Sequence, residues 1–148
     1  MSTRTLELET LTSGIAMLQP ILTNYGFSVA LPNTGSSSGG RFATVEFAHN
    51  SLVIGLIVRF AIRLGCPNYT EGHGYTAHDT LISELKTDTP QMLVPDDMLS
   101  YKAVDGGNPF AALAHDLSEI VFPSLASDPD GFSSALARSH RRSFGNLS

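Results

Sequence analysis

Two histidines and an aspartate stand close together in the stretch GHGYTAHDT, which covers residues 72–80. Imidazole nitrogens and carboxylate oxygens are ligands for zinc and similar ions, and a catalytic metal site needs about three of them around an open position. His73, His78 and Asp79 would supply such a set, although the histidines do not have the i, i+4 spacing that places two ligands on one helix face. One hypothesis is therefore a small metal-dependent hydrolase in which His73 reaches the metal from a loop.

The same stretch is also typical of the start of a helix. In Thr76-Ala77-His78-Asp79, the threonine hydroxyl can accept a hydrogen bond from the amide three residues later, while the acidic side chain reaches back to the cap. Hydroxyl and acidic groups are favoured there because the N-terminus of a helix is partially positive. We favour this capping interpretation, which places His78 in the first turn and leaves only His73 unexplained.

Cys66 is the only cysteine of the chain. An intramolecular disulfide and a zinc site built on thiolates are therefore excluded. As a catalytic nucleophile, Cys66 would need a basic neighbour that lowers the pKa of its thiol, and the local sequence supplies no clear one. We expect no catalytic residue and no cofactor, and we favour a protein that is not an enzyme.

Charged and aromatic side chains on the predicted sheet are candidates for a binding surface rather than a catalytic site. Glu46 and Arg59 alternate with apolar residues along two predicted strands, so they project from the second face of the sheet. Tyr69 and Tyr75 follow in the sequence and are expected beside them. These four residues are the candidate binding residues, but an ion pair of Glu46 with Arg59 or Arg63 is the favoured interpretation of the charged side chains.

A second group of predicted binding residues lies on a late helix. Asp116 and Glu119 fall on the side of this helix opposite its leucines, which is the side expected to face solvent. His73 is included among the predicted binding residues because capping does not explain it. These three side chains are polar, so the surface they form would be hydrated.

The elements that position these residues follow from the periodicity of the apolar side chains. A first helix is expected at residues 5–25 and ends at Gly26. Residues 27–31 read as a short strand, and residues 41–63 as two strands around a turn at 49–51, with Phe47 facing Leu52. Three more helices are expected, at residues 77–87, from Asn108-Pro109, and after Asp128-Pro129.

This order predicts the α+β class, with an N-terminal helix, a three-stranded antiparallel sheet with a central hairpin, and helices covering one face. The chain is expected to form a single domain over residues 1–148. Within it, residues 33–40 (NTGSSSGG) are predicted to be a flexible loop and residues 143–148 a C-terminal tail. Residues 88–107 are predicted to be a long loop with one helical turn near Met98.

The sequence GGRFATVEFAHNSLVIGLIVRF, followed by YTAHDTLISEL and NPFAALAHDLSEI, resembles a group of small bacterial proteins. In that group a Gly-Arg-Phe-Ala strand opens a hairpin, a short helix follows a Ser/Thr-His-acidic cap, and an Ala-x-Asp-Leu helix comes late. The resemblance covers about residues 39–136. It implies an α+β fold unit and no activity.

The net charge of −5 is distributed unevenly along the chain. Residues 1–78 are neutral, residues 79–130 carry −8, and residues 131–148 carry +3. This sign disfavours nucleic acid as a partner and is compatible with a protein partner that has a basic surface. The longest apolar run, residues 52–62, is interrupted by Gly55 and Arg59, so no membrane association is expected.

These observations favour a cytoplasmic protein that binds another macromolecule. The most specific version is an immunity-type protein whose acidic region neutralises a basic toxin. Sheet edges that need covering also favour a homodimer. The competing hypothesis remains the hydrolase with metal ligands His73, His78 and Asp79.

Overall fold

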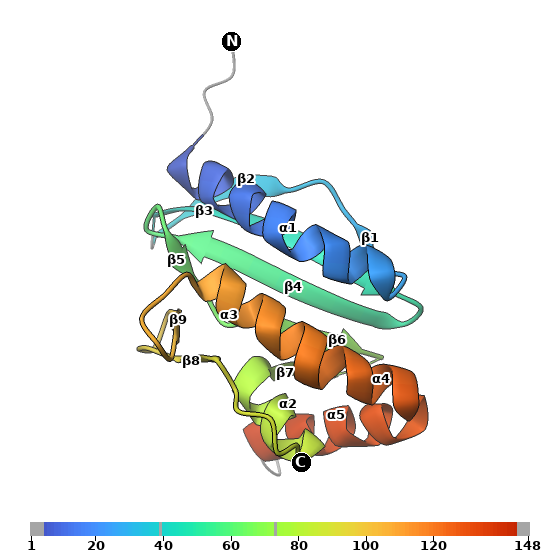
Figure 1. Cartoon of the computed structure of the whole chain (residues 1–148). Coiled ribbons are helices and arrows are strands. Elements are labelled where there is room, and N and C mark those ends of the chain that lie inside the picture. The colour runs from blue at the N-terminus through green and yellow to red at the C-terminus, as the bar shows by residue number, and fades with distance from the viewer. Residues whose placement is uncertain (1–4, 39, 73, 145–148) are drawn as a thin grey trace.

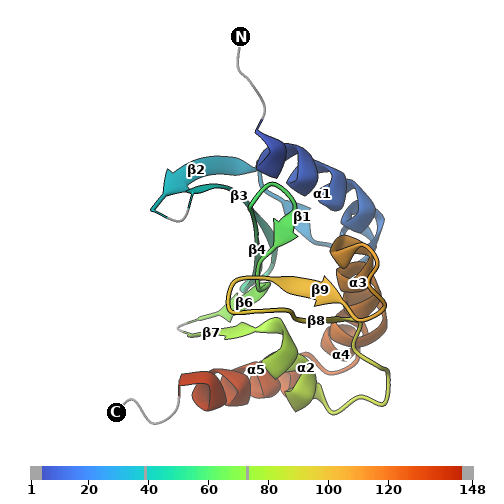
Figure 2. The same cartoon turned by 90° about the vertical axis from the view of Figure 1, so that its left-hand side faces the viewer.

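The computed structural model describes residues 5–38, 40–72 and 74–144, and shows helices packed on one face of an antiparallel sheet (Figure 1 and Figure 2). The helices are α1 (Leu6–Asn24), α2 (His78–Leu85), α3 (Pro109–Asp116), the π-helix η1 (Leu117–Val121), α4 (Phe122–Ser127) and α5 (Pro129–Phe144). The strands are β1 (Ser28–Val29), β2 (Asn33–Ser37), β3 (Gly40–His49), β4 (Leu52–Arg59), β5 (Arg63–Leu64), β6 (Asn68–Glu71), β7 (Gly74–Ala77), β8 (Leu93–Pro95) and β9 (Tyr101–Ala103). Among the described residues, none of the helices is long and apolar enough to cross a membrane.

Helix α1 begins and ends close to the predicted positions. The hydroxyl of Thr5 accepts a hydrogen bond from the amide of Leu8 at 3.2 Å, and Gly26 follows the helix with a φ of 80°. Gly14 lies at the contact with α3, where a Cβ atom would come within 2.3 Å of the ring of Phe110. The absence of a side chain at Gly14 therefore sets how closely α1 and α3 approach.

The prediction of a three-stranded sheet is wrong. The main sheet has seven antiparallel strands in the order β1-β3-β4-β6-β7, with β2 also pairing with β3 and β5 with β4, and β8 and β9 form a second, two-stranded sheet. The strands that the prediction missed are two to five residues long and include polar runs such as NTGSS and NYTE. Such segments lack the apolar alternation by which strands are recognised in a sequence.

The central hairpin of β3 and β4 forms with a register two residues away from the predicted one, because Phe47 lies opposite Ile54 rather than Leu52. A shift of two keeps every side chain on the same face of the sheet. The inner face is buried under the helices and carries Ala43, Val45, Phe47, Leu52, Ile54, Leu56 and Val58. The opposite side, here called the open face, carries Thr44, Glu46, Val53, Gly55, Ile57 and Arg59, none of which is fully buried.

Two segments predicted to be loops are paired strands. Residues 33–37 form β2, whose register with β3 runs from Asn33 opposite Thr44 to Ser37 opposite Gly40. Residues 93–103 form the β8–β9 hairpin in place of a helical turn near Met98. In both segments, backbone hydrogen bonds to a neighbouring strand outweigh a composition rich in serine, glycine or aspartate.

The segment from Pro109 to Ser127 is helical throughout but not uniformly α-helical. Asn108 accepts a hydrogen bond from the amide of Phe110 at 2.8 Å, as the predicted cap requires. The amide of Phe122 bonds to the carbonyl of Leu117, five residues earlier, which defines the π-helix η1. Pro123 would clash with the preceding turn of a regular α-helix. The wider π-turn lets the chain continue past Pro123 as α4.

Candidate functional site

A chain of hydrogen bonds between polar side chains runs through the protein interior. The hydroxyl of Tyr69 on β6 lies 2.7 Å from Nδ1 of His78 on α2, and Nε2 of His78 lies 2.9 Å from Oδ2 of Asp116 on α3. All three residues are 0 % exposed. An ionised carboxylate accepts hydrogen bonds only, so His78 donates from Nε2 and accepts from Tyr69 at Nδ1. Both ring nitrogens are thereby used.

Asp116 joins three further groups to this chain. It accepts hydrogen bonds from the amides of Met92 at 2.8 Å and Leu93 at 2.9 Å, and its Oδ1 lies 3.1 Å from Nδ1 of His115. Burial raises the pKa of Asp116, but the hydrogen bonds from His78, Met92 and Leu93 outweigh it and hold the pKa below its usual value. The carboxylate therefore fastens the start of β8 to α3, and its surroundings exclude a substrate.

A second polar cluster lies next to the first and involves Cys66, Asp79 and Tyr101. The hydroxyl of Tyr101 donates to Oδ1 of Asp79, and the sulfur of Cys66 lies 3.3 Å from the same hydroxyl. Burial raises the pKa of the Cys66 thiol, and burial likewise raises the pKa of Tyr101 well above its usual range. A protonated thiol is a poor nucleophile, so the cluster lacks the activated cysteine of thiol enzymes.

The predicted helix cap is wrong. Helix α2 has Ala77 at its N-cap without a side-chain hydrogen bond, and Asp79 turns towards Tyr101. Thr76 is buried, and its hydroxyl has no hydrogen-bond partner among the described residues. The reason is the orientation of β7, which points Thr76 into the core beside the fully buried His78.

The residues predicted to bind a metal are not brought together around an open position in the described part of the chain. His73 lies outside the described residues. His78 has both ring nitrogens engaged by Tyr69 and Asp116, and Asp79 engages Tyr101. Across residues 5–38, 40–72 and 74–144 there is no group of three or more histidine, cysteine, aspartate or glutamate residues that could hold a metal ion.

Two of the predicted binding residues are buried, contrary to expectation. Tyr69 was expected on the second face of the sheet and Asp116 on the solvent side of a helix, yet both are fully buried partners of His78. Glu119 and Tyr75 are exposed, but on separate elements, η1 and β7. Their hydrogen bonds to His78 explain the burial of Tyr69 and Asp116, because a buried polar group is stable when it has a hydrogen-bond partner.

Glu46 and Arg59 do share a surface, as predicted. They line a groove of about 410 Å³ on the open face, together with Leu31, Thr44, Gly55 and Ile57. The favoured prediction of an ion pair of Glu46 with Arg59 or Arg63 is wrong, because the ion pairs of the described residues join other groups. The groove therefore contains two opposite charges that remain available to a ligand or partner.

One end of the molecule exposes several large apolar side chains. This apolar end consists of Leu6, Phe60, Ile62, Met98 and Leu99. The start of α1, the β4–β5 turn and the β8–β9 turn all lie at this end in Figure 1, and hydrogen bonds of Glu7 and Thr10 to Ala61 join the first two. An ion pair of 3.0 Å between Arg63 and Asp97 links the two turns.

The β4–β5 turn at this end has an unusual backbone. Phe60 and Ala61 have φ values of 52° and 66°, in the left-handed region that non-glycine residues avoid at a cost of about 1–2 kcal/mol each. Helix α1 holds the turn, because the amide of Ala61 donates to the carboxylate of Glu7 at 2.7 Å and the hydroxyl of Thr10 donates to the carbonyl of Ala61 at 2.7 Å. Strained backbone of this kind concentrates at functional sites.

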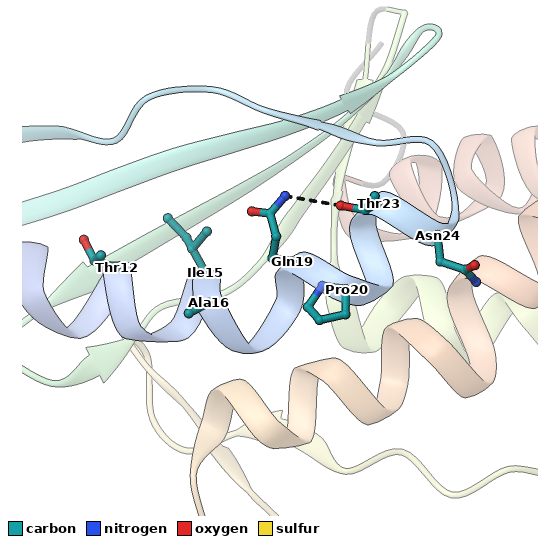
Figure 3. Close-up of a pocket in the computed structure, with 7 residues that line it drawn as sticks. All are labelled: Thr12, Ile15, Ala16, Gln19, Pro20, Thr23 and Asn24. Atoms are coloured by element: carbon teal, nitrogen blue, oxygen red, sulfur yellow. Dashed lines mark hydrogen bonds between the residues drawn. The ribbon is translucent and has the colours of Figure 1, made fainter.

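A larger depression, of about 830 Å³, runs along the outer side of α1 (Figure 3). Its lining consists of Thr12, Ile15, Ala16, Gln19, Pro20, Thr23 and Asn24. All seven residues belong to one helix, and Gln19 donates to Thr23 at 3.3 Å. A surface without a second wall and without a charged side chain offers no basis for selective binding of a small ligand.

Comparisons with models of known protein families, with curated proteins and with solved structures found no match for this chain. Its function must therefore be inferred from its own surfaces. Sequence reasoning identified Glu46 and Arg59 but missed the apolar end. A signal for it was present, since the apolar residues Phe60 and Ile62 lie between Arg59 and Arg63. Four of the five residues, however, lie in turns that are brought to one end of the molecule only by the fold.

Proposed function

We propose that this chain acts by binding a protein partner through its apolar end and catalyses no reaction. The observation that supports this function is the exposure of large apolar side chains on two turns that an ion pair links, with Ile62 71 % and Met98 99 % exposed. Contiguous exposed apolar surface bordered by charged groups is typical of protein–protein interaction sites. The Arg63–Asp97 and Lys102–Asp96 ion pairs supply charged groups beside these apolar side chains.

The fixed shape of the β4–β5 turn supports the same proposal. Glu7 and Thr10 hold the left-handed residues Phe60 and Ala61 before any partner arrives. A preformed turn loses little conformational entropy when its side chains enter a pocket, so more of the contact energy contributes to affinity. The expected partner presents an apolar depression that receives Phe60 and Ile62, with a polar rim.

The acidic region gives less support to the toxin-neutralising version of this function. Glu84 pairs with Arg138 and Arg142 at 3.1 and 2.7 Å, and Asp97 pairs with Arg63. Asp116 belongs to the interior. Part of the negative charge between residues 79 and 130 is therefore compensated within the chain, so we propose an apolar rather than an electrostatic contact. The cytoplasm is the compartment that we propose, since Cys66 is the single cysteine.

The proposal is tested by comparing variants of exposed residues at and away from the apolar end. Tagged protein is used to recover partners from an extract of the source cells, and each recovered protein is then purified and titrated against the wild type. Ile62→Ser and Met98→Ser are each expected to weaken binding about tenfold or more, as substitutions at central interface positions do. Val104→Ser, which changes an apolar side chain 57 % exposed outside the apolar end, is the matched control and should bind like the wild type.

Two results would contradict the proposal. One is a purified partner whose affinity is the same for wild type, Ile62→Ser and Met98→Ser. The other is the absence of any partner together with binding of the wild type to phospholipid vesicles that the two variants lose. The second result would mean that the apolar end binds a membrane surface, as amphipathic surfaces with basic borders can do.

A further inference from the structure

The open face of the main sheet carries an acidic and a basic residue that can form an ion pair with each other only across two molecules. Glu46 on β3 and Arg59 on β4 line the same groove, and neither has an ion-pair partner among the described residues. We propose that two copies of this chain associate through their open faces, with Glu46 of each copy paired to Arg59 of the other. This association uses a surface apart from the apolar end and does not depend on the proposed function.

The register of the hairpin places the two charges symmetrically about its centre. Thr44 lies opposite Ile57, Glu46 lies two residues further along β3, and Arg59 lies two residues further along β4. Because the strands are antiparallel, these displacements have opposite directions, and at about 3.4 Å per residue each is roughly 7 Å. A two-fold axis that crosses the strands at the Thr44–Ile57 pair therefore brings Glu46 of each copy level with Arg59 of the other, on the adjacent strand.

Gly55 supplies the space for this contact. It lies opposite Glu46, and a Cβ atom built at Gly55 would meet no other atom within 4 Å. Under the two-fold axis, the methylene stem of Arg59 from the second copy crosses the sheet above Gly55. Its guanidinium group then reaches the carboxylate of Glu46 on the adjacent strand. Two sheets packed face to face lie about 10 Å apart, a separation that long side chains of this kind span.

A second copy satisfies both charges with one surface, which is the property of an isologous interface. Arg59 pairs in register with Arg63, a like charge, and Arg63 is already bound to Asp97 at 3.0 Å. A carboxylate from another molecule would relieve this repulsion. Leu31, which is 88 % exposed beside the same groove, would be covered by the second copy.

Charge reversal tests the pairing directly. Sedimentation equilibrium of the wild type between about 1 and 100 μM should detect a dimer whose dissociation constant rises with salt, because the ion pairs are screened. Glu46→Arg and Arg59→Glu each place like charges together twice in the dimer, and each is expected to weaken dimerisation at least about tenfold. The double variant Glu46→Arg/Arg59→Glu restores opposite charges and should return the dissociation constant to within a few-fold of the wild type.

Matched reversals elsewhere separate this pairing from a general effect of net charge. Glu119→Arg and Arg141→Glu change exposed residues on η1 and α5 and should dimerise like the wild type. A wild type that stays monomeric over the whole concentration range would overturn the proposal. So would a dimer that tolerates either single reversal at position 46 or 59, or a double variant no tighter than the single ones.

Discussion

Replacing Asp116 by alanine would remove one acceptor that four donors share. These donors are the imidazoles of His78 and His115 and the amides of Met92 and Leu93. His115 is partly exposed and can turn to water, but the other three lose their partner in or near the interior. Each unsatisfied buried donor costs about 1–3 kcal/mol, and breaking a buried charged contact typically costs about 3–5 kcal/mol in total. We expect Asp116→Ala to lower the free energy of unfolding by about 3–5 kcal/mol.

Asp116→Asn should cost less, for a reason specific to this network. With its oxygen in the place of Oδ1, an asparagine still accepts from the amide of Met92, and its NH2 group in the place of Oδ2 can donate to Nε2 of His78 if the imidazole changes tautomer. The same NH2 group cannot accept from the amide of Leu93, which bonds to Oδ2 of the aspartate. His78 would then donate from Nδ1 to the oxygen of Tyr69, whose own hydroxyl proton would lose its acceptor in a fully buried site. Two neutral hydrogen bonds are lost, those of the Tyr69 hydroxyl and the Leu93 amide, so the expected destabilisation is about 1–3 kcal/mol.

Urea unfolding followed by far-UV circular dichroism measures both effects. With a slope of about 2 kcal/mol/M, Asp116→Asn should lower the midpoint by about 0.5–1.5 M and Asp116→Ala by about 1.5–2.5 M. Asp88→Ala, an exposed aspartate outside the network, is the control and should shift the free energy by less than about 0.5 kcal/mol. An Asp116→Ala protein as stable as this control would refute the assignment of Asp116 as the shared acceptor.

Three other outcomes are expected from the contacts described above. Gly14→Ala should destabilise the protein by about 1–3 kcal/mol despite the higher helix propensity of alanine, because the new methyl group overlaps the ring of Phe110; a rise in melting temperature would contradict this. Thr76→Val should raise the melting temperature by a few degrees, since it removes a buried hydroxyl without a partner and keeps the shape, and calorimetry measures it. The pKa of Asp116 is lower in the folded than in the unfolded protein, so its stabilising contribution is present above about pH 4 and is lost as the pH falls further. Asp116→Asn should accordingly flatten the acid side of the stability profile measured by urea unfolding.

The elements that could be predicted from the sequence are those with local signals. The pair Asn108-Pro109 marks the start of α3, and Gly26 marks the end of α1, because caps and left-handed residues depend on the adjacent backbone alone. The long strands β3 and β4 show a clear alternation of buried and exposed residues. Their exact register was not predictable, since a shift of two residues leaves the same faces in place.

The parts that could not be predicted depend on contacts between distant residues. Asp116 bonds to His78 across 38 positions of the chain. The local sequence is the same whether a histidine in the first turn of a helix is exposed to solvent or buried between two hydrogen-bond partners. The short strands β2 and β5 are stabilised by pairing with β3 and β4 and carry little signal of their own. Of the candidate sites, the Glu46–Arg59 groove was predictable because both residues lie on the two clearest strands.

The π-helix η1 changes where this chain can tolerate a change in length. In an α-helix every residue advances the side chains by about 100°, so removing one residue normally rotates all that precedes it away from its partners. The turn that ends with the bond from Phe122 to Leu117 contains one residue more than an α-turn needs. Losing a residue there would convert the turn to α-helix and keep both Asp116 and Phe122 facing inward. A related chain can therefore be one residue shorter within a buried helical segment, rather than only in a surface loop.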